Sequence, residues 1–90
     1  MTIELTAAMI AESKQGCRSC PYALAINAHL AEGLMTQPGY NWTYIVNVHD
    51  FVLATIATPV EMSHRMKEWD RTGEITPHSF ELDLPEHVLP

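Results

Sequence analysis

The chain has 90 residues, which is the length of one domain, so residues 1–90 are expected to fold as a single unit. Eleven acidic against five basic side chains give a formal net charge of −6, which disfavours binding to nucleic-acid phosphates. No apolar run approaches the ~20 residues of a membrane span. The first residues also lack the basic and apolar regions of a signal peptide. We therefore expect a cytoplasmic protein that does not contact membranes. Since a chain of this size buries only roughly 60–65% of its surface, we also expect a homo-oligomer, namely a dimer.

The first elements are short. Residues 2–5 place apolar side chains on either side of Glu4 and predict a strand. Thr6 suits the N-cap of a helix over residues 7–14, and Gly16 would end that helix.

The second helix has the clearest start signal. Pro21 suits a first helical position because its missing N–H group would have no partner there, which makes Cys20 or Ser19 the N-cap. Gly33 would end the helix. Apolar residues at helical spacing predict one buried face, formed by Ala23, Ile26 and Leu30.

The middle of the chain reads as a loop and a hairpin. Residues 36–41 contain a Pro-Gly turn and predict a loop. Alternation then predicts a strand whose apolar positions are Trp42, Tyr44, Val46 and Val48. We expect Tyr44 to face the core, and Ile45, which breaks the pattern, to indicate that the second face is partly covered. His49-Asp50 forms a tight connection to the apolar run 51–57, so the two runs predict an antiparallel hairpin.

A third helix should follow. Thr58 would cap it, Pro59 would take its first position, and Glu61 would complete a capping box. Gly73 would end it. The predicted buried face contains Met62, Met66 and Trp69.

A last strand is expected over residues 75–82, with Pro77 at its start or on an edge of the sheet, followed by an irregular tail over residues 83–90. The predicted order is β-α-α-β-β-α-β. The fold class is therefore α+β, with a small, mostly antiparallel sheet and helices on one of its faces.

Cys17 and Cys20 have the spacing of a zinc or redox half-site. Zinc would need two further ligands, and the histidines are scattered without ligand spacing. A thioredoxin-like redox role would need a βαβ setting that is missing here. We therefore predict a reduced, packed cap residue at Cys20 and no metal, with a small zinc or redox protein as an alternative.

The start of the second helix is a candidate anion site. Unpaired N–H groups there, with the Arg18 guanidinium and the Ser19 hydroxyl, could hold a phosphate or carboxylate. The aromatic cluster after the loop could stack a base, with Trp42 as the better candidate. No Ser/His/Asp or Cys/His pairing can be recognised, so we predict a protein without catalytic residues or cofactor.

Two segments resemble a family of short phage-encoded proteins. Residues 20–25 (Cys-Pro-Tyr-Ala-Leu-Ala) match a Cys-Pro-x-Ala-Leu-Ala block, and residues 69–82 match an aromatic-Asp-x-x-Gly-x-x-x-Pro-Phe-Ser-Phe-Glu-Leu block. The chain differs at His78, where Phe is usual. Small phage proteins include anti-defence sponges, such as the sequestin and lockin types, which hold nucleotide immune signals made by bacterial TIR enzymes.

The resemblance thus implies a phage anti-defence protein that sequesters an ADP-ribose-type signal of Thoeris (TIR) signalling without cleaving it. The alternative from another class is an interaction module that inhibits a host protein. The expected partner is a small nucleotide-derived ligand. The expected ligand-binding residues are Arg18, Ser19, Cys20, Tyr22, Trp42, Tyr44, His78 and Ser79.

Overall fold

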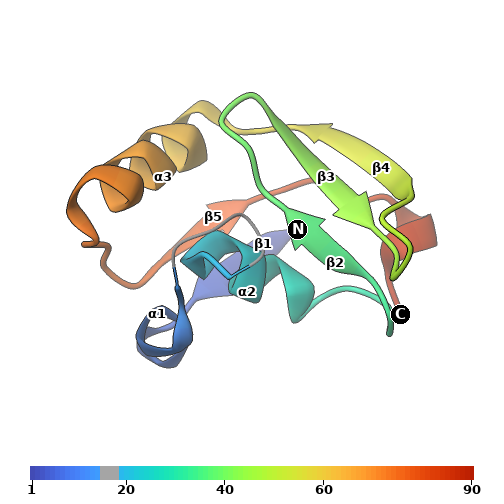
Figure 1. Ribbon diagram of the computed structural model, residues 1–90, viewed down its shortest axis with the longest axis horizontal. Coiled ribbons are helices and arrows are strands. Elements are labelled where there is room, and N and C mark those ends of the chain that lie inside the picture. Colours follow the sequence, from blue (N-terminus) through green and yellow to red (C-terminus); the bar gives the residue numbers. More distant parts are fainter. Residues whose placement is uncertain (15–18) are drawn as a thin grey trace.

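The computed structural model describes residues 1–14 and 19–90 (Figure 1). Two antiparallel sheets and helices make up these residues, which confirms the α+β class and the predicted order, with one strand added. In chain order the elements are β1 (Thr2–Leu5), α1 (Ala7–Glu12), α2 (Pro21–Asn27), β2 (Met35–Gln37), β3 (Trp42–Val46), β4 (Val52–Ala57), α3 (Val60–Thr72), β5 (His78–Glu81) and the 3₁₀ turn η1 (Glu86–Val88).

The two sheets meet at α2. One sheet pairs β1 with β5 and places Ile3 opposite Phe80, and the other has the order β2-β3-β4. Helix α2 contacts both β1 and β2, and it lies across the two sheets in Figure 1. The core forms around this helix. It contains Ile3, Leu5, Cys20, Tyr22, Ala23, Ala25, Ile26, Leu30, Ile45, Met62, Met66, Trp69, Leu82 and Val88.

Helix α2 begins as its sequence predicts. Pro21 takes the first turn, and the Cys20 sulfur accepts a hydrogen bond from the Ala23 N–H at 3.4 Å. The cap interpretation of Cys20 is therefore confirmed. The helix ends at Asn27, well before Gly33, because the Asn27 side chain turns to accept the Thr36 N–H at 2.7 Å and ties the helix to β2.

Two other elements, α1 and β5, are shorter than predicted. Helix α1 ends at Glu12, and the Ser13 hydroxyl donates to the Ile10 carbonyl at 2.6 Å just after it. The expected stop at Gly16 lies outside the described residues. Strand β5 begins at His78, directly after Pro77, which cannot donate a ladder hydrogen bond.

Strand β2 lies partly within the predicted loop, so the prediction of a loop over residues 36–41 was wrong at its start. Thr36 pairs opposite Ile45 and is fully buried. Three residues followed by a proline give too short a pattern to be recognised as a strand.

The buried face of β3 is the reverse of the predicted one over its first four residues, Trp42 to Ile45. A β-bulge follows Ile45, and Val46 is buried as well. Thr43 and Ile45 are fully buried, whereas Trp42 is 51% and Tyr44 36% exposed. The hydroxyls of Thr43 and Thr58 form a hydrogen bond of 2.8 Å, which satisfies both groups inside the protein. The expectation that Tyr44 faces the core is therefore wrong.

Helix α3 begins without the predicted capping box. Its N-cap is Pro59, with no side-chain cap bond, because the Thr58 hydroxyl instead donates to the Gly39 carbonyl at 2.7 Å. Glu61 pairs with Arg65 one turn on. The predicted C-terminal stop is confirmed, since Gly73 is left-handed (φ 72°) and its N–H donates to the Trp69 carbonyl at 2.7 Å.

The tail after residue 82 packs against the domain and is not irregular throughout. Val88 is fully buried, and its carbonyl accepts the Ala31 N–H at 2.9 Å. His87 donates from Nε2 to the Leu53 carbonyl at 2.8 Å, which ties the tail to β4. Among the described residues, no helix is long and apolar enough to cross a membrane.

Candidate ligand pocket between β5 and α3

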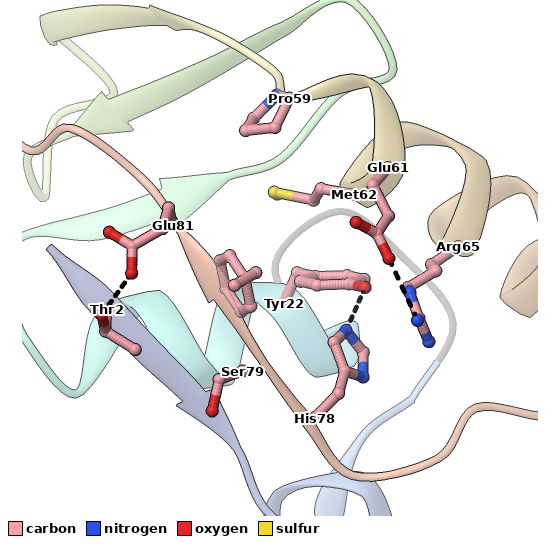
Figure 2. Close-up of a pocket in the computed structure, with 10 residues that line it drawn as sticks. Thr2, Tyr22, Pro59, Glu61, Met62, Arg65, His78, Ser79 and Glu81 are labelled. Carbon is pink, nitrogen blue, oxygen red and sulfur yellow. Dashed lines mark hydrogen bonds and ion pairs between the residues drawn. The ribbon is translucent and has the colours of Figure 1, made fainter.

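A pocket of about 350 Å³ lies between β5 and the first turns of α3 (Figure 2). Strand β1 contributes Thr2, and α2 contributes Tyr22. The complete lining is Thr2, Tyr22, Pro59, Glu61, Met62, Arg65, His78, Ser79, Phe80 and Glu81. The pocket therefore draws on four elements that are far apart in the sequence.

Tyr22 and His78 form the polar centre of the pocket. The Tyr22 hydroxyl lies 2.7 Å from His78 Nε2, and His78 Nδ1 lies 2.7 Å from the Thr76 carbonyl oxygen. Since a carbonyl only accepts hydrogen bonds, the neutral imidazole carries its proton on Nδ1. Nε2 is then the acceptor, and the Tyr22 hydroxyl is the donor.

The Tyr22 ring is held rigidly. It is fully buried, and the Phe80 ring packs edge-on against it with centroids 4.9 Å apart. Burial raises the pKa of Tyr22, the positive charge of Arg65 opposes this shift in part, and the carboxylate of Glu61 adds to it. The phenol therefore keeps its proton to a higher pH than an ordinary tyrosine, and it acts as a hydrogen-bond donor to His78.

Charged groups line the rim. Arg65 on α3 donates to the Glu61 carboxylate at 3.2 Å, and its side chain remains 38% exposed. Figure 2 shows both side chains reaching from α3 toward the end of the Tyr22 ring that bears the hydroxyl. At the opposite end, Glu81 accepts a hydrogen bond from the Thr2 hydroxyl, which lowers the pKa of that carboxyl group. The pocket thus offers one guanidinium, one imidazole, two carboxylates and several hydroxyls.

Three predicted site residues meet in this pocket, namely Tyr22, His78 and Ser79. Ser19 and Cys20 do not line it, and Arg18 lies outside the described residues. Helix α2 has only seven residues, and the Ala23 N–H at its start is already bonded to Cys20. The start of α2 is therefore not supported as an anion site by the residues that the structure describes.

Trp42 and Tyr44 lie away from the pocket, on the exposed face of the β2-β3-β4 sheet. In their place the pocket contains Arg65 and Glu61, which the sequence analysis did not select. The sequence predicts a capping box for Glu61 and no role for Arg65. Only the approach of β5 to α3 places this pair beside Tyr22.

The described residues contain no group of three or more His, Cys, Asp or Glu side chains that could hold a metal ion. Cys17, the other half of the proposed cysteine pair, lies outside the described residues.

Comparisons with protein-family models, with curated proteins and with solved structures give no match to this chain.

Proposed function

We propose that this protein binds a small nucleotide-derived anion of the ADP-ribose type in the pocket between β5 and α3, and that it holds the ligand without cleaving it. A phage anti-defence sponge for a TIR-derived signal would act in this way. One observation supports the proposal above all. Arg65, His78 and the hydroxyls of Tyr22 and Ser79 line one cavity that also has apolar walls. Its volume of about 350 Å³ falls in the range of small-molecule sites.

The two sides of the pocket suit different parts of such a ligand. Arg65 supplies the positive charge for a phosphate, and Ser79 lines the same cavity and supplies a hydroxyl donor. Phe80 and Met62 give an apolar surface against which a base can lie. The phosphate site is therefore proposed at Arg65 and not at the start of α2.

The two carboxylates favour a sugar-containing ligand over free phosphate. Glu61 and Glu81 would repel a bare anion, but carboxylates accept hydrogen bonds from ribose hydroxyls. On phosphate binding, Arg65 would exchange part of its contact with Glu61 for the ligand.

Sequestration without cleavage agrees with the state of Tyr22. Because burial raises its pKa, this phenol does not supply an anionic nucleophile at neutral pH. His78 is held by hydrogen bonds at both ring nitrogens, which favours a positioning role for the imidazole.

The test is calorimetric titration with ADP-ribose, a cyclic ADP-ribose, AMP and inorganic phosphate, followed by chromatography of the recovered ligand. We expect a sugar-containing member to bind and to be recovered intact. Arg65→Gln should weaken binding roughly 10- to 100-fold, because a charge-assisted hydrogen bond contributes about 1.5–3 kcal/mol. Arg71→Gln is the matched control, since Arg71 lies on the same helix, is paired with Glu68 and does not line the pocket. Absence of binding by every member of the panel would refute the proposal.

The second candidate function is an interaction module that inhibits a host protein. It is favoured by a different observation, the exposed apolar face that carries Trp42 and Tyr44. A pull-down from host lysate distinguishes the two functions, because a sponge would release a small molecule and no stoichiometric protein.

A further inference from the structure

The exposed face of the β2-β3-β4 sheet is uncharged, and it carries two large aromatic side chains beside the polar Gln37 and Thr55. The register places Trp42 opposite Ala57 and Tyr44 opposite Thr55, while the buried Thr43 and Ile45 point to the other side. Leu53 lies at the β-bulge of β4 and is 40% exposed, so it adds to the exposed apolar surface. We call this surface the outer face, and its residues are Gln37, Trp42, Tyr44, Leu53, Thr55 and Ala57.

The hairpin tip extends the apolar surface beyond the end of the strands. In the turn, Val48 is 68% and Phe51 66% exposed, and Val52, the first residue of β4, is 54% exposed. The tip is ordered by the Asn47 side chain, whose oxygen accepts the His49 N–H at 2.9 Å and the Phe51 N–H at 3.1 Å. An ordered turn that holds large apolar side chains in water indicates a surface that becomes covered.

We infer that a second copy of this chain covers the outer face and the hairpin tip, which makes the protein a face-to-face dimer. Charge is the first argument for this occupant. Between Glu32 and Glu61 the sequence contains a single charged residue, Asp50, whereas the whole chain has a net charge of −6. Two acidic copies repel each other wherever their carboxylates meet. Strands β2, β3 and β4 carry no carboxylate, and the hairpin tip carries only Asp50, so repulsion is smallest on this surface. A basic partner would instead be matched by acidic side chains on the face.

Area is the second argument. The exposed parts of Trp42, Tyr44 and Phe51 amount to roughly 300 Å². With the aliphatic side chains the patch reaches roughly 600 Å², which is the upper end for a lone monomer. Two such patches together would bury about 1,200 Å², the lower limit of a stable interface. Sheets commonly pack in this way, with their faces about 10 Å apart. The inferred dimer therefore reaches the size of the smallest stable interfaces, and it does not depend on the proposed ligand.

The experiment is sedimentation velocity of the full chain over concentrations from about 1 to about 200 µM. We expect the mass to rise from 10.1 kDa toward twice that value. Thr55→Glu places a carboxylate at the centre of the outer face without removing a buried group, and it should weaken the dimer at least about tenfold. The matched control is Thr76→Glu, which adds the same charge at an exposed residue before β5 and should leave the dimer unchanged.

A thermal melt of each variant shows that the domain is folded. If Thr55→Glu does not fold, Phe51→Ser in the hairpin tip replaces it, because Phe51 is two-thirds exposed and outside the core. A wild-type chain that stays at 10.1 kDa over the whole range would overturn the inference and leave the face to a partner of another kind. A folded face variant that dimerises as tightly as the wild type would overturn it as well.

Discussion

Tyr22→Phe should lower the free energy of unfolding by about 1 kcal/mol, because it removes one hydrogen bond and almost no packing. The ring of Tyr22 is fully buried, and its edge contact with Phe80 would survive the change. What is lost is the bond of 2.7 Å from the hydroxyl to His78 Nε2. For a domain of this length, 1 kcal/mol corresponds to a melting temperature lower by about 4–8 °C.

The companion change His78→Phe should cost more, roughly 1–3 kcal/mol, because it leaves the buried Tyr22 hydroxyl without its acceptor. In the Tyr22→Phe background no hydroxyl is left behind, so His78→Phe should then cost about 1 kcal/mol less than in the wild type.

Urea unfolding of the wild type, both single variants and the double variant measures this coupling directly. The fluorescence of the buried Trp69 gives the signal, and Tyr44→Phe on the exposed outer face serves as the control for a tyrosine hydroxyl outside the core. If His78→Phe costs the same in both backgrounds, the hydrogen bond contributes nothing to stability and the reasoning is refuted.

Three further outcomes follow from local geometry. Above about pH 10, the ordinary pKa of tyrosine, the wild type should lose stability faster than Tyr22→Phe in urea melts. Since burial raises the folded-state pKa, the unfolded chain ionises first and binds fewer protons, with a slope of at most about 1.4 kcal/mol per pH unit. Gly39→Ala should lower the melting temperature more than Gly73→Ala. A Cβ at Gly39 would lie 2.5 Å from the Trp42 carbonyl oxygen, whereas at Gly73 it meets nothing within 4 Å and only the left-handed backbone costs about 1 kcal/mol. Cys20→Ser should keep α2 capped, and Cys20→Ala should be about 1 kcal/mol less stable than Cys20→Ser in a thermal melt.

Helix boundaries were predictable where one short segment decides them. Pro21 after Cys20 and the left-handed Gly73 act through the backbone within a single turn, and both predictions were confirmed. Thr58 failed as a cap because its hydroxyl has two distant partners, the Gly39 carbonyl and the Thr43 hydroxyl. A side chain that can satisfy a buried strand residue is no longer available to the helix start, and the sequence does not show that competition.

The side-chain orientation of β3 shows what an alternating pattern cannot predict. The period of two correctly groups Trp42 with Tyr44 and Thr43 with Ile45, but it does not say which pair is inside. It also groups Val46 with the exposed aromatic residues, whereas Val46 is buried after the bulge that follows Ile45. The size of the aromatic rings favoured the wrong side. The Thr43–Thr58 hydrogen bond removes the usual cost of burying a threonine, so the smaller pair could take the inner face.

Only part of the pocket lining was predicted from the sequence, because residues that are far apart along the chain form the pocket. Tyr22 and His78 are 56 residues apart, and their contact depends on β5 pairing with β1 while α3 packs above it. Within the described residues β5 pairs with β1 alone, so its other side borders a cavity and not a neighbouring strand. The sequence around Arg65 contains no pattern that predicts a cavity beside this strand.

Tyr22 links the core to the pocket, since one side chain is both a fully buried core residue and part of the pocket lining. A ligand that binds only the folded pocket stabilises the domain by mass action, so binding should raise the melting temperature as well. Substitutions of a buried lining residue and of an exposed lining residue should then have different effects on stability and on the stabilisation by ligand. Tyr22→Phe lowers stability with or without ligand, whereas Arg65→Gln, at a half-exposed position, should reduce mainly the increment that the ligand adds. An equal loss of that increment in both variants would mean that the ligand depends on the Tyr22–His78 pair as much as on the guanidinium.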